Sequence, residues 1–159
     1  MKTPGDTQQN LEVYEDSKSV DKLEYMEMLG SLMYLSTGSR PDITFVISNL
    51  SRFSKDPREI HLNALKRVFR YLKGTLDYSL KFPYESGKLH MSTDASWSVT
   101  RDGKSYSGYI VKIGKAIISW KSKIQPLVAL STWESELIAL CDGICELTWV
   151  RNVITELGV

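Results

Sequence analysis

The sequence has few of the residues that form disulfides or bind soft metal ions. Its 159 residues include two cysteines, Cys141 and Cys145, and two histidines, His61 and His90. The cysteines lie four residues apart, so that both thiols share one face of a helix and a disulfide between them would need awkward geometry. The histidines lie far apart and lack metal-ligand spacing. We expect two reduced, buried thiols and two structural histidines.

Long apolar runs and a strong net charge are also absent. No stretch approaches the roughly 20 apolar residues of a membrane span, and the N-terminus lacks the apolar segment of a secretory signal. We therefore expect no membrane span and a cytoplasmic location. The net charge of +1 indicates no class of partner, but acidic residues prevail over residues 1–27 and basic residues over residues 52–81.

The first half of the sequence has helical periodicity after a polar tail that we place at residues 1–21. A helix is expected from Lys22 to about Gly38, and a second from Pro41 to about Phe53. A third is expected to begin at Asp56-Pro57, with Asp56 as its N-cap, and to end at Gly74. These helices form the expected region 22–82.

The second half, residues 83–159, changes to the alternation typical of strands. Strands are expected over residues 76–82, 89–93, 105–113 and 116–122, with a short extended piece over 126–130. The pattern Ser131-Thr132-Trp133-Glu134 then resembles a capping box and starts a long helix that runs close to the end of the chain. The sequence therefore predicts an α+β fold: a helical N-terminal half followed by a mixed sheet and one long C-terminal helix.

Three carboxylates follow one another in an order that suggests a metal site. Asp94 lies at the end of a predicted strand, and Glu134 and Glu136 lie at the start of the predicted long helix. Carboxylate oxygens are the ligands that magnesium prefers, and two such metals can cleave a phosphodiester. On residue types alone the alternatives stay open, because an Asp after a strand is usually a turn residue and a Glu in a first helical turn favours the helix dipole.

The third predicted helix has a basic side. Its cations could contact the backbone of a nucleic acid, with a solvated amphipathic face as the alternative. The residues concerned are Arg58, Lys66, Arg67, Arg70 and Lys73. The four tryptophans are expected to pack in the core or on the sheet rather than to stack on bases; they are Trp97, Trp120, Trp133 and Trp149.

Longer motifs carry a resemblance to a known family. In order, they are LGSLMYLSTGSRPDITFVISNLSRF, HLNALKRVFRYLKGTLDYSLKF, TDASW, SGYIVKIGKAIISWKSKIQPLVALSTWESELIAL and WVRNVITELG. From about Tyr25 to Gly158 they resemble the C-terminal part of the Pol polyprotein of copia-type LTR retrotransposons. The resemblance implies a connection region over residues 22–82 and the start of a ribonuclease H domain over residues 83–159. It also implies that Asp94 and Glu136 are metal-site carboxylates for cleaving the RNA strand of an RNA–DNA hybrid.

The sequence departs from that family in ways that bear on catalysis. The family's CDNQSA and RTKHID motifs, which bring further carboxylates, have no counterpart up to Val159, and Asp142 matches a helix position instead. Two carboxylates do not easily hold two hydrated magnesium ions. We expect a truncated RNase H-like sheet with an open edge, vestigial Asp94 and Glu136, no cofactor unless magnesium binds a completed site, and no appreciable nuclease activity.

The expected function is therefore that of an interaction protein with an unknown protein partner and at most weak binding to nucleic acid. Similar copia-derived fragments are found among the secreted RxLR effectors of oomycete downy mildews. That resemblance implies delivery to a host plant cell and suppression of immunity or cell death. The sequence has no R-x-L-R tetrapeptide, and Arg70-Tyr71-Leu72-Lys73 comes nearest. The alternative is a vestigial ribonuclease H within a retrotransposon Pol polyprotein.

Overall fold

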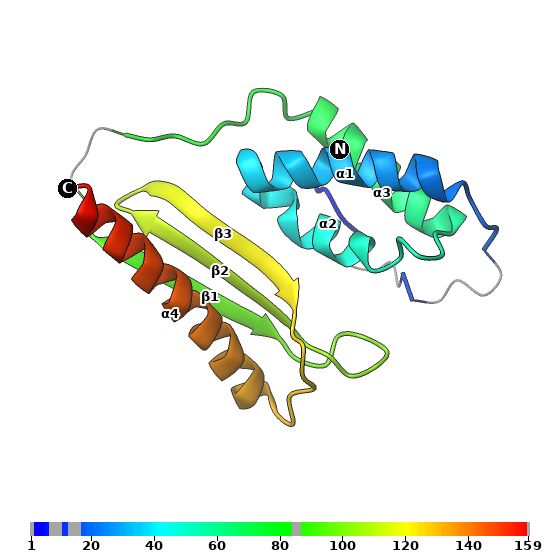
Figure 1. The fold of residues 1–159 in the computed structure, drawn as a ribbon. Helices are drawn as coiled ribbons and strands as arrows, with labels where there is room; N and C mark the ends of the chain where they lie inside the picture. Colours follow the sequence, from blue (N-terminus) through cyan, green and yellow to red (C-terminus); the bar gives the residue numbers. More distant parts are fainter. Residues whose placement is uncertain (1, 7–10, 13–16, 84–86, 159) are drawn as a thin grey trace. The chain divides into compact units, whose positions relative to one another are not determined.

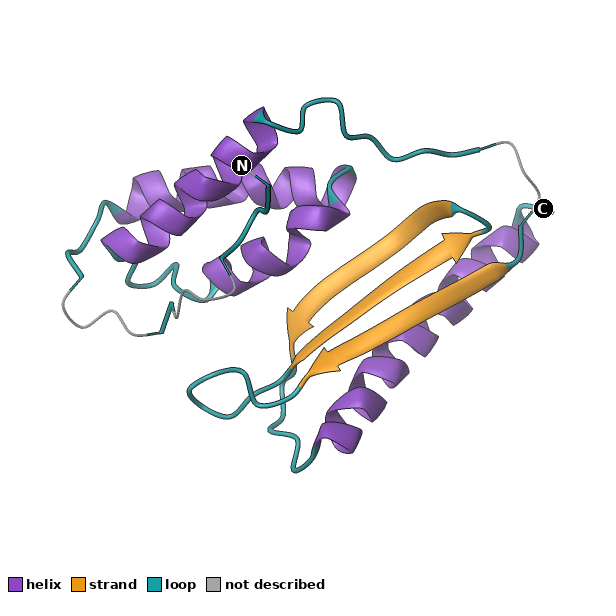
Figure 2. Cartoon of the chain, turned by 180° about the vertical axis from the view of Figure 1, so that it is seen from behind, coloured by secondary structure: helices purple, strands orange, loops and turns teal. Residues whose placement is uncertain are grey.

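The computed structural model describes residues 2–6, 11–12, 17–83 and 87–158. The chain divides into two compact units, a helical unit (Met1–Ser79) and a sheet unit (Leu80–Val159), which are described here one at a time. Helices make up the first unit, and a three-stranded sheet with one helix makes up the second (Figures 1 and 2). The predicted α+β class is confirmed. Much of the predicted polar tail, residues 7–10 and 13–16, lies outside the described residues.

Among its described residues, the helical unit contains three α-helices. Helix α1 (Lys22–Gly38) begins after Asp21, whose Oδ1 accepts the N–H of Leu23 at 2.8 Å, and it ends at the predicted glycine. A single 3₁₀ turn, η1 (Pro41–Ile43), leads into α2 (Thr44–Ser51), and α3 (Glu59–Lys73) follows. The helix predicted from Pro41 to about Phe53 is therefore a 3₁₀ turn followed by a shorter α-helix.

The start of α3 differs from the prediction. Its N-cap is Arg58, and Asp56 and Pro57 precede the helix. The backbone around Pro57 is drawn into an extended pairing with the segment before α1, because Val20 N–H donates to the Pro57 carbonyl at 3.3 Å and Glu59 N–H donates to the Lys18 carbonyl at 2.8 Å. This pairing holds Pro57 and Arg58 out of the helical conformation, so Asp56 does not cap the helix.

The three helices share one core. Its buried members come from every helix of the unit, and the Tyr25 hydroxyl inside it donates to the Leu50 carbonyl at 2.9 Å. Burial raises the pKa of the Tyr25 hydroxyl, so this donor stays protonated. The core residues are Tyr25, Leu29, Leu32, Ile43, Ile47, Leu50, Leu62, Ala64, Leu65, Val68 and Tyr71.

The sheet unit is an antiparallel meander. Strands β1 (Leu89–Ser96), β2 (Tyr106–Ile113) and β3 (Ala116–Ile124) lie in the order β1-β2-β3, so β1 and β3 are the two edges among the described residues. Ile113 pairs with Ala116, and Gly114 takes a positive φ of 56° in the tight turn between them. The strands predicted over residues 76–82 and 126–130 are absent from these positions, where the chain is irregular.

Helix α4 (Thr132–Glu156) covers one face of the sheet over β1 and β2 (Figure 2). It approaches closely because Gly143 presents no side chain: a Cβ there would lie 2.5 Å from Met91 Sδ and 2.7 Å from Thr93 Cγ2. The buried core of this unit is small, with Tyr109, Val111 and Val150 at its centre. Although α4 has 25 residues, none of the helices in the described part of the chain is long and apolar enough to cross a membrane.

Candidate functional site at the Asp94 strand and helix α4

Strand β1 positions Asp94. Half-buried and exposed residues alternate along β1, and Asp94 is one of the exposed ones, paired with Gly108 of β2. Its neighbour Thr93 faces Gly143 of α4. Because successive residues of a strand point to opposite faces, the Asp94 side chain lies on the face of the sheet away from α4. Asp94 is therefore a strand residue and not a turn residue.

The first turns of α4 position the other two acids. Ser131 is the N-cap, and its Oγ accepts the N–H of Glu134 at 3.2 Å. The Glu134 carboxylate in turn accepts the N–H of Leu130 at 2.7 Å. The predicted capping role of Ser131 and Glu134 is confirmed. In a capping box the acid accepts the N–H of the N-cap residue itself, whereas Glu134 accepts the N–H of Leu130, one residue before the N-cap. Glu136 lies one position past Ser135 and is half-buried.

Asp94 and Glu136 do not form a metal site with each other. Glu136 belongs to the helix on one face of the sheet, and Asp94 points from the other face. Neither forms a hydrogen bond or ion pair with a described residue, and no group of three or more His, Cys, Asp or Glu side chains in residues 2–6, 11–12, 17–83 and 87–158 could hold a metal ion. These residues do not fit the two magnesium ions that hybrid cleavage uses.

Two further acids of α4 have contacts with the sheet instead. Lys123 of β3 donates to Asp142 at 2.8 Å, and Ser119 of β3 donates to Glu146 at 2.7 Å. Burial, reinforced by the nearby Glu146 carboxylate, raises the pKa of Tyr109 to about 12. Asp142 and Glu146 therefore fasten α4 to β3.

The basic residues of α3 fall into two groups. Arg58 pairs with Asp56 at 2.6 Å, and Arg67 pairs with Asp6 at 3.0 Å. The remaining three lie exposed on α3 and make no hydrogen bond or ion pair with a described residue; they are Lys66, Arg70 and Lys73. Only these three cations are available for a phosphate backbone without breaking an existing contact.

Comparison with known proteins shows which proteins the chain is similar to in sequence. The chain is 38% identical over 159 residues to the retrovirus-related Pol polyprotein from transposon RE1 of Arabidopsis thaliana, covering 99% of this chain and 11% of that protein. It is 38% identical over 146 residues to the Pol polyprotein from transposon TNT 1-94 of Nicotiana tabacum, again 11% of that protein. It is 40% identical over 128 residues to secreted RxLR effector protein 161 of Plasmopara viticola, of which it covers 90%.

The chain belongs to the copia-type retrotransposon Pol family. It spans about a tenth of the length of the Pol polyproteins that it matches. No family model matches the chain, and no solved structure matches it. The family resemblance expected from the motifs is thereby confirmed for nearly the whole chain.

In this Pol-family chain the cysteines and tryptophans are less buried than expected. Cys141 and Cys145 are both free and exposed on α4, so the prediction of buried thiols is wrong. Trp97 and two tryptophans of α4 are also exposed, and Trp97 Nε1 donates to the Ala129 carbonyl at 3.0 Å. The sheet unit packs its core from one face of α4 alone, which leaves large side chains on the other face uncovered.

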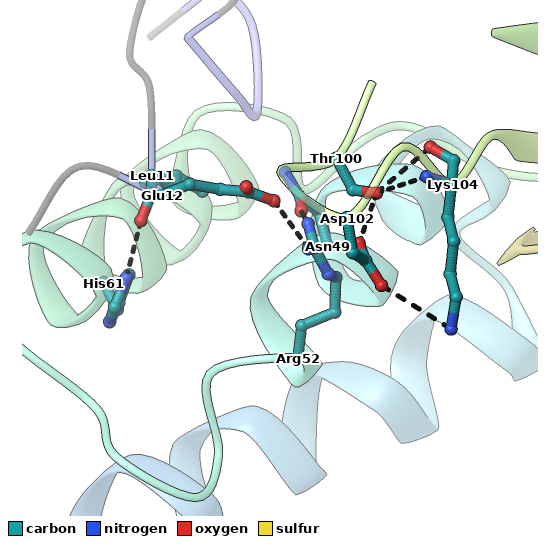
Figure 3. Close-up of polar contacts among 8 residues, drawn as sticks. All are labelled: Leu11, Glu12, Asn49, Arg52, His61, Thr100, Asp102 and Lys104. Atoms are coloured by element: carbon teal, nitrogen blue, oxygen red, sulfur yellow. Dashed lines mark hydrogen bonds and ion pairs between the residues drawn. The ribbon is translucent and has the colours of Figure 1, made fainter. Parts of the chain in front are cut away.

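His61 is structural, as expected, but its role was not foreseeable from the sequence. It is fully buried and stacks on Phe53 at 4.0 Å between ring centroids. Its Nδ1 accepts the N–H of Arg58 at 3.0 Å, so Nε2 carries the proton and donates to the Leu11 carbonyl at 2.9 Å (Figure 3). Burial lowers the pKa of His61, with the Leu11 contact opposing the shift. The imidazole thus caps α3 in its neutral form.

A buried polar network around Arg40 was also missed. Arg40 donates to both oxygens of Asp42, at 2.9 and 2.7 Å, and to Thr75 Oγ1 at 2.7 Å. Burial opposes ionisation of Asp42, yet hydrogen bonds from Arg40 and Tyr71 hold the pKa of that carboxyl below its usual range. The network ties the end of α1 to the end of α3. In the sequence, Arg40 shows only as a polar residue before a proline.

The loop after β1 is closed by its own side chains. Thr100 Oγ1 donates to Asp102 at 2.6 Å and accepts the Lys104 N–H at 2.8 Å, while the Lys104 ammonium lies 3.6 Å from Asp102 (Figure 3). Thr100 is buried. These local contacts give the loop a defined shape.

Proposed function

We propose that this polypeptide, taken by itself, is a non-catalytic RNase H-like module that acts by binding other molecules. The observation that carries the proposal is the placement of Asp94 and Glu136. Asp94 leaves the exposed face of β1, whereas Glu136 lies on the helix that covers the other face. Cleavage by two metals needs several carboxylates converging on ions about 4 Å apart, and these two side chains do not supply such a set.

A cleavage assay tests the proposal directly. The purified chain is incubated with an RNA–DNA hybrid in magnesium, beside Asp94→Asn and Glu136→Gln variants. We expect no magnesium-dependent cleavage above background and no difference among the three proteins. Cleavage that disappears in Asp94→Asn would show that the site is assembled and would overturn the proposal. The variant also controls for contaminating nuclease, because a contaminant cleaves equally in every preparation.

The alternative is that the same residues contribute to a ribonuclease H within a Pol polyprotein. Similarity to Pol polyproteins over 99% of the chain favours it. In that setting other segments would have to supply the carboxylates that complete the metal site beside Asp94. Hybrid cleavage that appears only when the chain is joined to the other segments of a Pol polyprotein, and that is lost on Asp94→Asn, is the result that distinguishes this alternative from a binding module.

We further propose an effector role as a second candidate. Its support is the similarity to secreted RxLR effector protein 161, which this chain matches at 40% identity over most of that protein's length. Such a role implies secretion, a host plant protein as partner and suppression of immunity or cell death. Expression in leaf tissue beside a cell-death elicitor tests it. A reduction in cell death supports the role, and unchanged cell death with the protein detected in the tissue removes it.

A further inference from the structure

Helix α4 carries an apolar stripe on the side that the sheet does not cover. Four large side chains recur at intervals of four, three and four residues, and each is between 38% and 73% exposed: Trp133, Leu137, Leu140 and Ile144. This spacing is the heptad pattern that lets one helix pack along another. The opposite side of α4 is occupied, since Ala139, Gly143 and Val150 are buried against the sheet.

Charged residues flank the stripe with opposite signs at its two ends. Glu134 and Glu136 lie beside its beginning, and Arg151 continues the same line of residues two turns beyond Ile144. Arg151 is exposed, and its side chain makes no hydrogen bond or ion pair with a described residue. In a pair of antiparallel copies, the basic end of one stripe lies over the acidic end of the other. The stripe is therefore electrostatically complementary to itself.

We propose that this stripe is a docking surface for a second copy of the same chain, with the two α4 helices packed antiparallel about a two-fold axis. Leu137 of each copy then packs on Ile144 of the other, and Leu140 lies opposite Cys141. Under two-fold symmetry, each contact between a residue of one copy and a residue of the other occurs twice, with the two copies interchanged. The register places the two Cys141 thiols beside the axis and each Cys145 thiol one turn away from it.

The interface is small. It consists of one helix face about four turns long, below the size of standard stable interfaces. Arg151, at the basic end of each stripe, contributes mainly to the relative orientation of the two helices and to the salt dependence of dimerisation. Self-association of this kind is a concentration-dependent equilibrium rather than a permanent dimer. It is independent of hybrid cleavage, so either property can fail in experiment without the other.

Sedimentation velocity at increasing protein concentration tests the pairing. We expect the weight-average sedimentation coefficient to rise with concentration, and Leu140→Asp to weaken dimerisation by about tenfold or more, because it places two carboxylates beside the axis. Leu23→Asp changes an equally typical exposed leucine on α1 and should leave the rise intact. Circular dichroism and tryptophan emission confirm that both variants are folded. A chain that stays monomeric, or a dimer that Leu140→Asp leaves unchanged, overturns the proposal.

The two exposed cysteines test the register independently. Mild oxidation with diamide converts two facing thiols into one disulfide, the oxidant taking up both electrons and both protons. We expect Cys145→Ser to cross-link into a covalent dimer through Cys141 and Cys141→Ser to cross-link far less. The reverse order of cross-linking, or cross-linking that Leu140→Asp does not reduce, would refute the antiparallel register. Arg151→Glu should weaken the dimer and reverse its dependence on salt, because added salt then screens a repulsion instead of an attraction, and failure to do either counts against it.

Discussion

Replacing Gly143 by alanine would place a methyl group between α4 and β1. The new Cβ would lie 2.5 Å from Met91 Sδ and 2.7 Å from Thr93 Cγ2, against 3.4–4 Å for an ordinary contact. Met91 can move its flexible end away, but the β-branched Thr93 is held on its strand and has little freedom. Relief therefore requires α4 to lift from the sheet.

The magnitude follows from two opposing effects. Overpacking a well-packed site by one methyl group costs about 1–3 kcal/mol, while alanine gains about 1 kcal/mol over glycine in helix propensity. Because both new contacts are shorter than 3.0 Å, the overpacking cost should lie in the upper part of that range, at about 2–3 kcal/mol. We therefore expect Gly143→Ala to lower the free energy of unfolding of the sheet unit by about 1–2 kcal/mol. For a unit of this size each kcal/mol lowers Tm by about 4–8 °C.

The assay can isolate the sheet unit, because all four tryptophans belong to it. Urea unfolding followed by tryptophan emission should shift to lower urea for Gly143→Ala. The matched control is Gly30→Ala in α1, where a Cβ would meet nothing within 4 Å. That variant should stabilise the helical unit in circular dichroism by about 0.5–1 kcal/mol and leave the tryptophan transition unchanged. A Gly143→Ala protein as stable as the parent would refute the close packing of α4 on β1.

Two further predictions concern the helical unit. The pKa of His61 is lower in the folded protein than its unfolded value of about 6.5. The contribution of neutral His61 to the stability of this unit should therefore be complete above about pH 6.5 and should be lost as the pH drops through the folded pKa. Urea unfolding followed by circular dichroism at a series of pH values checks this, and a stability that does not change with pH contradicts it. Arg40→Ala removes a buried guanidinium and leaves the buried Thr75 without its donor, which should cost about 1–3 kcal/mol. Arg70→Ala on the exposed side of α3 should stay within about 0.5 kcal/mol, and equal effects of the two substitutions would contradict the network.

The sequence predicts the elements that have both periodicity and a partner to pack against. In α1 and α4, apolar residues recur at helical spacing, and some of them are buried in the structure. Residues 76–82 alternate as well, but Leu76, Tyr78 and Phe82 are all exposed and the segment pairs with no described strand. Alternation alone does not make a strand when no neighbouring backbone accepts and donates its hydrogen bonds.

Within the candidate site, local chemistry was predictable and long-range placement was not. Ser131 and Glu134 were foreseeable because capping depends on residues that are close in sequence. Which face of the sheet Asp94 occupies depends instead on where α4 packs, and that is a tertiary contact. The Arg40 network joins residues 35 positions apart, and exposure of Cys141 depends on which side of α4 the sheet covers. None of these features can be recognised from the local sequence pattern.

The segment before α1 has a consequence for the way the helical unit forms. Its described residues hold α3 through contacts far along the chain: Leu11 to His61 spans 50 positions and Asp6 to Arg67 spans 61. Three helices joined by short connections would otherwise have mostly local contacts, and such topologies fold fast. Here the residues before α1 are synthesised earlier than α3 and cannot make these contacts until α3 has followed. We therefore expect these contacts with α3 to form after α1, α2 and α3 have packed together.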